Sequence, residues 1–220
     1  MIFSHSCSNE TAAPTTPAHV TLVIESVSAQ KFKANEKSFY HRAGSTVDSI
    51  RINRVRILLR NVKLRKTKDS VIFLPQTKII ELTNSVKFVT ADVQDVREGS
   101  YAYLDIDVHK PPLKADSLPE YSNAGFVEFL EGEHYSIIVD GIVYDQLSTS
   151  NFTFKVRAEL LSRIIFSPQL SITSAKDITL PVVINLSAWF AESSGLSLNP
   201  LDSGNELTIY NNIVNSFSLK

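Results

Sequence analysis

The sequence predicts an all-β protein with a single helix near its C-terminus. Apolar and polar residues alternate with a period of two in many short stretches, as they do in strands that have one buried face. Proline and glycine residues lie between these stretches, where turns are expected. Only from Leu207 to Phe217 do apolar residues recur every three and four positions, which predicts a helix whose start Asp202 or Ser203 would cap.

The first two predicted strands differ in their regularity. Residues 20–24 alternate without interruption, and the second strand begins at Ile50. In that second strand the alternation slips by one position at residues 53–54 and again at residues 60–61. An unbroken strand would turn its apolar face outward after each slip. Each slip therefore predicts a β-bulge or a short break.

The later strands are short and are separated by turn signals. The most regular alternation of the chain runs from Tyr101 to Val108, and Pro111 and Pro112 follow it. Because proline cannot donate to a strand ladder, we predict that residues 110–125 form a long connection or a subdomain boundary. The later strands as a set are predicted at residues 71–74, 78–82, 101–108, 135–143, 152–158, 164–166 and 178–186.

Composition excludes several classes of protein. The 220 residues are 43% hydrophobic and 20% charged, with a net charge of -1, which is ordinary for a folded protein and does not favour nucleic acid as a partner. No stretch reaches the roughly 18 apolar residues of a membrane-spanning helix. The single cysteine, Cys7, excludes an intrachain disulfide and a cysteine zinc site.

The residues around Cys7 are similar to the end of a lipoprotein signal peptide. Ser6 is the small residue that a lipoprotein signal peptidase requires, and a segment rich in Ser, Thr, Ala and Pro follows the cysteine. We expect residues 1–17 to be a disordered tether lipidated at Cys7, and Met1 to be an internal methionine of a longer product. The alternative is an unpaired cysteine in a flexible tail. Residues 18–220 are the predicted β-sandwich domain.

No group of residues predicts catalysis. A nucleophile needs a neighbouring base, most often histidine, and motifs for nucleophile elbows, phosphate loops and metalloproteases are absent. We therefore predict a non-enzymatic protein without a cofactor. The histidines lie in the tail, in loops or at strand ends: His5, His19, His41, His109 and His134.

Several carboxylates lie close together in the sequence. Asp105 and Asp107 share one face of a predicted strand, and Asp92, Asp95 and Glu98 precede them, so they could supply oxygen ligands for calcium. The same residues are equally the polar positions of a solvated strand, and no EF-hand spacing follows. We predict no metal site.

Charge is distributed unevenly along the chain. Residues 51–68 hold eight basic residues and no acid, whereas residues 92–145 hold twelve acids. One interpretation is a basic patch for an anionic glycan, lipopolysaccharide or nucleic acid, with Arg54, Arg56, Arg60 and Lys63 as the candidate ligand-binding residues. The alternative is cross-strand pairing with the acidic strand at residues 101–108. Aromatic residues do not interleave with the basic ones, as a nucleic-acid platform requires.

Two regions show a resemblance to a known family. In the first region, residues 52–108, a basic strand and a short strand precede Val96-Arg97-Glu98-Gly99-Ser100-Tyr101, which leads into a long strand. In the second region, Phe152-Thr153-Phe154 precedes Ser187-Ala188-Trp189-Phe190, and Leu198-Asn199-Pro200 precedes the predicted helix. This arrangement resembles the secreted-lipoprotein family known as domain of unknown function 4382.

The resemblance implies a location, a fold and a class of function. It implies a bacterial cell-envelope protein, either an outer-membrane lipoprotein or a periplasmic one, with an Ig-like or transthyretin-like β-sandwich, antiparallel and of Greek-key style, and a short C-terminal helix. We expect it to present a binding surface for a glycan or an envelope protein, with a lipid anchor as its membrane contact. The alternative is a structural or adhesive subunit of a surface fibre assembled by strand addition. Trp189 and Phe190 are expected in the core rather than in a ligand site.

Overall fold

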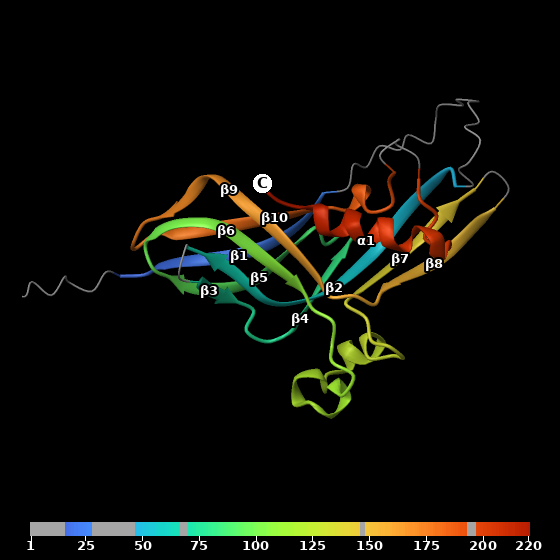
Figure 1. Cartoon of the computed structure of the whole chain (residues 1–220), viewed down its shortest axis with the longest axis horizontal. Coiled ribbons are helices and arrows are strands. Elements are labelled where there is room, and N and C mark those ends of the chain that lie inside the picture. Colours follow the sequence, from blue (N-terminus) through green and yellow to red (C-terminus); the bar gives the residue numbers. More distant parts are fainter. Residues whose placement is uncertain (1–15, 28–46, 67–69, 146–147, 193–196) are drawn as a thin grey trace, which may run out of the picture.

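The computed structural model describes residues 16–27, 47–66, 70–145, 148–192 and 197–220. These residues form a sheet of four strands, sheet A, and a sheet of seven strands, sheet B. The α-helix α1 (Glu206–Asn215) follows near the C-terminus (Figure 1). The structure thus confirms the predicted β-sandwich with its short C-terminal helix.

Sheet A contains one parallel pair of strands. Its order is β11-β10-β1-β5, and β1 pairs with β10 in parallel from His19 and Asp177 to Val27 and Asn185. The remaining pairs of the sheet are antiparallel. The antiparallel prediction therefore holds except where two strands from opposite ends of the chain meet. The four strands are β1 (Ala18–Val27), β5 (Phe88–Val96), β10 (Asp177–Asn185) and β11 (Phe217–Leu219).

Sheet B is built around β2 (Ser49–Arg65), the longest strand. Along one edge of β2 lie β3 and β4 in succession, and along the other edge lie β6 and then β7. Next to these, β9 pairs with β6 and β8 pairs with β7. Two strands therefore lie end to end along each edge of β2: β3 with β4 on one side, and β6 with β7 on the other. The bounds are β3 (Ser70–Phe73), β4 (Lys78–Thr83), β6 (Gly99–Val108), β7 (Ile137–Tyr144), β8 (Thr149–Val156) and β9 (Leu160–Ile172).

The two slips in the sequence pattern of β2 are irregularities of its pairing. The register with β7 shifts between Ile52 and Arg54, and the register with β6 shifts between Arg60 and Lys63. An extra residue at each place returns the apolar side chains to the core face. As a result Ile57 on one side of the second shift and Leu64 on the other are both fully buried. The bulge prediction is confirmed.

Four elements differ from the prediction. No strand was predicted at β5, because its apolar residues Phe88 and Val93 are exposed and obscure the period of two. β9 extends well beyond residues 164–166, and the exposed Leu161 and Ile165 on its solvent face obscure its period of two. The helix ends at Asn215, so that Phe217 belongs to β11. The Asp202 side chain caps a short 3₁₀ turn rather than α1.

The C-terminal helix (Figure 1) packs against β8 and β9 of sheet B: the Tyr210 ring lies 6.2 Å from the Phe154 ring, and Ser162 Oγ donates to the Val214 carbonyl at 2.8 Å. Trp189 is fully buried and donates its indole N–H to Ser216 Oγ at 2.8 Å. Phe190 packs edge-on against Phe152 and Phe154, with ring centroids 5.7 and 5.8 Å apart. Both residues therefore belong to the core, as predicted.

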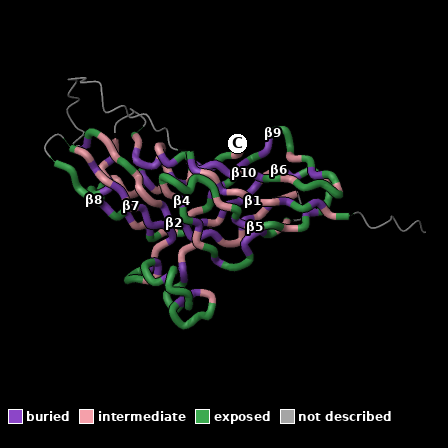
Figure 2. Tube along the Cα trace, turned by 180° about the vertical axis from the view of Figure 1, so that it is seen from behind, coloured by how far each residue is buried: buried purple, intermediate pink, exposed green. Residues whose placement is uncertain are grey.

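Between β6 and β7 the chain leaves the sheet and forms a small lobe, residues 109–136. The lobe contains three 3₁₀ helices, η1 (Ala115–Ser117), η2 (Pro119–Tyr121) and η3 (Ala124–Phe129), and it projects from the sheets with an exposed surface (Figures 1 and 2). Its own small core packs on Leu58 and Ile138. The predicted connection at residues 110–125 lies inside this lobe.

Candidate functional site

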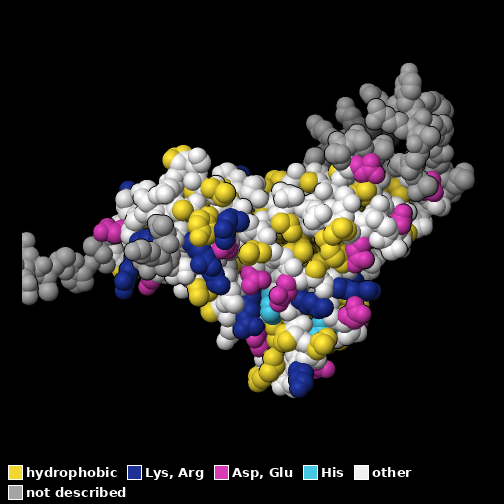
Figure 3. Space-filling model, viewed as in Figure 1, with side chains coloured by type: hydrophobic (Ala, Val, Ile, Leu, Met, Phe, Trp, Pro, Cys, Tyr) yellow, Lys and Arg dark blue, Asp and Glu magenta, His cyan; other side chains and the backbone are white. Residues whose placement is uncertain are grey.

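The candidate site lies on the face of sheet B that is turned away from the core, which we call the outer face. Successive side chains of β2 and β6 point to opposite faces of the sheet here. Leu64 and Leu104 point to the core and are fully buried, whereas their neighbours Lys63 and Asp105 line an open pocket of about 350 Å³ on the outer face. The lobe covers the outer face around Leu58. Beyond the lobe, basic and apolar side chains lie side by side on the surface (Figure 3).

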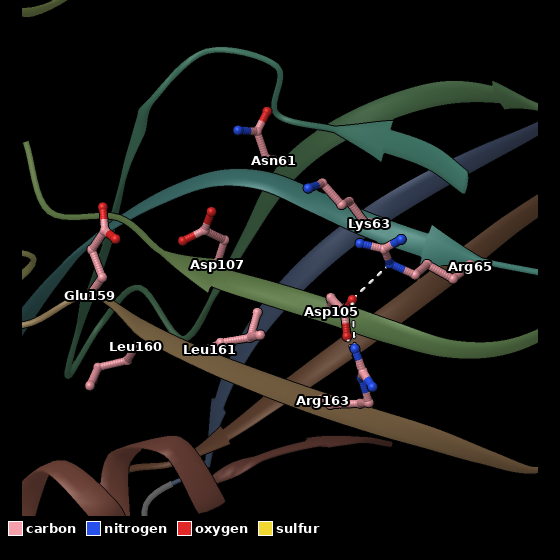
Figure 4. Close-up of a pocket in the computed structure, with 9 residues that line it drawn as sticks. All are labelled: Asn61, Lys63, Arg65, Asp105, Asp107, Glu159, Leu160, Leu161 and Arg163. Carbon is pink, nitrogen blue, oxygen red and sulfur yellow. Dashed lines mark hydrogen bonds and ion pairs between the residues drawn. The ribbon is translucent and has the colours of Figure 1, made fainter. Parts of the chain in front are cut away.

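A buried carboxylate, Asp105, organises two arginines at this pocket. Arg163 donates from Nε to Asp105 Oδ1 at 2.6 Å and from Nη2 to Oδ2 at 3.2 Å. Arg65 donates from Nε to Oδ2 at 2.8 Å (Figure 4). Burial alone would raise the pKa of Asp105, but the hydrogen bonds from Arg163 and Arg65 hold it below its ordinary value. The aspartate thus stays ionised and keeps both guanidinium groups in place.

The outward side of both arginines is open. The Asp105 side chain is 4% exposed, whereas Arg65 and Arg163 are 35% and 50% exposed. The Arg163 guanidinium lies 4.3 Å from the centre of the Tyr103 ring, which restricts its motion further. Lys63, the neighbour of Asp105 in register, makes no ion pair with any carboxylate in the described part of the chain. Three cationic groups therefore face solvent together.

The other end of the pocket is acidic. Asp107 and Glu159 lie there together with Asn61 (Figure 4). Asp107 makes no hydrogen bond or ion pair within the described residues, and burial raises its pKa. Glu159 is exposed, and one of its carboxylate oxygens lies 3.7 Å from His109 Nδ1.

The predicted basic residues are mostly engaged within the protein. Arg54 pairs with Asp140 at 2.9 Å, the buried Arg56 pairs with Glu128 of the lobe at 2.6 Å, and Arg60 pairs with Glu120 of the lobe at 3.5 Å. Of the four candidates only Lys63 lines the pocket.

The basic strand does lie beside the acidic one, as the alternative of cross-strand pairing expects. Arg65 of β2 donates to Asp105 of β6 at 2.8 Å, whereas Lys63 and Arg60, which lie opposite Asp105 and Asp107 in register, make no ion pair with those carboxylates. Sequence reasoning missed Arg65 as a site residue although it belongs to the basic run. It missed Arg163 because that residue lies in a part of β9 that no apolar alternation revealed.

A second polar cluster joins the lobe to the sheet. His109 Nε2 lies 2.8 Å from the Tyr121 hydroxyl, which lies 3.2 Å from Thr77 Oγ1. Burial lowers the pKa of His109 and raises that of Tyr121. A buried tyrosine with a raised pKa is a poor nucleophile, so this arrangement is suited to fastening the lobe.

The described residues show neither a membrane helix nor a metal cluster. In that part of the chain no helix is long and apolar enough to cross a membrane, and no three His, Cys, Asp or Glu residues are grouped as metal ligands. Asp92 accepts from the Leu74 amide and Asp95 pairs with His19, so the carboxylates considered for calcium are apart. Cys7 and His41 lie outside the described residues.

Comparison with protein families, curated proteins and solved structures finds no match for the chain. The resemblance to the secreted-lipoprotein family therefore stays a prediction.

Proposed function

We propose that this protein is a non-enzymatic cell-envelope protein that binds an anionic glycan on the outer face of sheet B. The observation that carries the proposal is Asp105, which holds Arg65 and Arg163 with their outward nitrogens exposed. Preorganised guanidinium groups bind carboxylate and sulfate with little loss of side-chain entropy. Lys63 adds a third cation beside them.

The surroundings of the arginines favour a sugar over a free inorganic anion. Leu161 and Ile165 are 58% and 74% exposed on β9, and Tyr103 lies beneath Arg163. Apolar surface next to charged donors suits a pyranose ring, which has an apolar face and a polar rim. The pocket is shallow and open, as a site for one or a few units of a long chain would be.

A retention experiment tests the proposal. The full chain would be passed over columns of heparin, polygalacturonate and dextran, which offer a sulfated, a carboxylated and a neutral polysaccharide. We expect retention on at least one of the two anionic columns and none on dextran. The variant Lys63→Gln/Arg65→Gln should lose retention, because it removes two cations while Arg163 remains on Asp105. The control Arg51→Gln/Arg97→Gln removes the same charge elsewhere and should behave as the wild type. Equal retention of both variants would exclude the outer-face site.

Attachment to the envelope is proposed through lipidation at Cys7. The small residue before Cys7 and the polar segment after it support this part of the proposal. In cells grown with an alkyne-bearing fatty acid, the protein should be labelled and recovered with membranes, and Cys7→Ser should abolish both. Labelling that persists in Cys7→Ser would contradict the proposal.

The second candidate function is a subunit of a surface fibre, and one observation favours it. Within the described residues no strand pairs with β8 on the side away from β7, so β8 offers an edge of eight residues. The edge of β5 is less suitable, since Lys78 Nζ donates to the Ala91 carbonyl at 2.7 Å and a charged side chain at an edge opposes strand addition. Sedimentation at increasing concentration distinguishes the two functions: a fibre subunit forms growing oligomers, and a glycan-binding protein does not.

A further inference from the structure

The acidic end of the pocket adds a requirement that an anionic glycan alone does not meet. The residues that line the pocket include three basic side chains, Lys63, Arg65 and Arg163, and three acidic ones. Asp105 is already neutralised by the two arginines. The remaining acids, Asp107 and Glu159, lie together at the opposite end from the arginines (Figure 4). The pocket is thus dipolar rather than uniformly basic.

Asp107 has no partner among the described residues of the protein. It is half-buried, and no donor in the described part of the chain lies within hydrogen-bond distance of it. Its oxygens still reach solvent, and partial burial raises the pKa of this carboxyl without a protein donor to stabilise its charged form. Arg60, which faces it in register, is turned to Glu120 of the lobe instead. Asp107 is therefore available to accept a hydrogen bond from a ligand in the pocket.

The spacing of the two ends suits a single sugar unit or two adjoining ones. Asp105 and Asp107 are two residues apart on β6, which separates their positions by roughly 7 Å along the strand. An anionic group held by the arginines and a cationic group at Asp107 would therefore be about one pyranose ring apart. Asn61 also lines the acidic end and can exchange hydrogen bonds with hydroxyl groups.

We propose that the ligand is a zwitterionic glycan, in which a carboxylate or sulfate contacts Arg65 and Arg163 and a free amine of an amino sugar contacts Asp107 and Glu159. This inference rests on the proposed glycan-binding function and specifies its ligand. The amine enters as an ammonium ion and donates to the carboxylates, so that both ends of the pocket are neutralised at once. An N-acetylated sugar lacks that charge and leaves Asp107 unpaired.

Three forms of heparin that differ at the glucosamine nitrogen test the inference: the N-sulfated form, the de-N-sulfated form with free amines, and the de-N-sulfated and re-N-acetylated form. Binding of the full chain would be measured by calorimetry. We expect the free-amine form to bind about tenfold more tightly than the N-acetylated form, as one charge-assisted contact contributes. Asp107→Asn should remove that preference while retaining binding of the N-acetylated form. The matched control Asp116→Asn, in the lobe, should keep the preference.

The outcomes separate the two proposals. Equal affinity of the wild type for the free-amine and N-acetylated forms would overturn the amine requirement and leave anionic-glycan binding in place. Absence of binding to all three forms, together with failure of polygalacturonate to bind, would overturn the proposed function. A preference that survives in both Asp107→Asn and Glu159→Gln would overturn the assignment of the amine to this end of the pocket. Thermal unfolding of each variant serves as the control that the substitution leaves the fold intact.

Discussion

Arg56 and Glu128 join the sheet to the lobe through an ion pair of 2.6 Å, in which the arginine side chain is 8% exposed and the glutamate is 47% exposed. The hydrogen bond from Arg56 lowers the pKa of Glu128. Asp140 lies 3.6 Å from the same guanidinium. The lobe is thus attached through a buried cation rather than through its small core alone.

Removal of Glu128 should destabilise the protein although the glutamate itself is half-exposed. Glu128→Gln withdraws the nearest carboxylate from a buried charge, at a cost of about 1–2 kcal/mol, since Asp140 compensates in part. The double variant Arg56→Met/Glu128→Gln removes the buried charge and should recover most of the loss. Urea unfolding of the three proteins measures this, and a double variant less stable than Glu128→Gln would contradict the account.

The Asp105 carboxylate should be a major stabilising group of the outer face. Asp105→Asn leaves two arginines adjacent without their shared anion and should cost about 2 kcal/mol at neutral pH. Since the folded pKa of Asp105 is below its ordinary value, its contribution is present above the unfolded pKa of about 3.9 and is lost as the pH falls through the folded pKa. Unfolding at pH 7 and pH 3 should therefore show a smaller effect of the substitution at pH 3. The same effect at both pH values would exclude the charge as its cause.

His109 should make the attachment of the lobe sensitive to acid. Burial lowers the pKa of His109 in the folded protein. As the pH falls below the pKa of about 6.5 that histidine has in the unfolded chain, the unfolded chain binds a proton more readily than the folded protein, and the free energy of unfolding decreases. Tyr121, Glu159, Arg60, Asp107 and Glu120 surround the imidazole. Between pH 7.5 and 5.5 the wild type should lose about 0.5–1 kcal/mol more than His109→Gln. An identical pH dependence of the two proteins would show that the imidazole does not control this response.

The pairing of β7 with its neighbours should depend on Gly141. A Cβ atom at this position would lie 2.5 Å from the Arg51 carbonyl oxygen and 2.5 Å from the Phe152 ring. Gly141→Ala should therefore cost about 2–3 kcal/mol. Gly125→Ala is the control, because its nearest neighbour is a flexible Ile79 methyl at 3.1 Å, and it should change the melting temperature little. A melting temperature of Gly141→Ala equal to that of the wild type would contradict this packing.

The sequence predicted those parts of the fold in which the apolar period is strong. The interruptions of β2 at residues 53–54 and 60–61 were visible because a slip in a period of two has a single structural meaning. The strand β5 was not visible, since Phe88 and Val93 are exposed. The parallel pairing of β1 with β10 joins segments about 150 residues apart, and local sequence patterns do not predict which distant strands pair.

The candidate site could be predicted only in part. The run of basic residues in β2 and the acidic alternation of β6 indicated that opposite charges face each other across two strands. Which of the basic side chains can reach a ligand depends on the position of the lobe, whose Glu128 and Glu120 form ion pairs with Arg56 and Arg60. No local signal distinguishes these from Lys63 and Arg65, which face the pocket.

The most direct test of the central claim is the location of the binding surface. Amide resonances of the ¹⁵N-labelled full chain would be followed during titration with polygalacturonate oligosaccharides and with de-N-sulfated heparin fragments. The largest shifts are expected on β2 after the second bulge, on β6 and on β9, around Lys63, Asp105 and Arg163, with little change along β8. Shifts concentrated on β8 or on sheet A, with the residues around Asp105 unchanged, would contradict that claim.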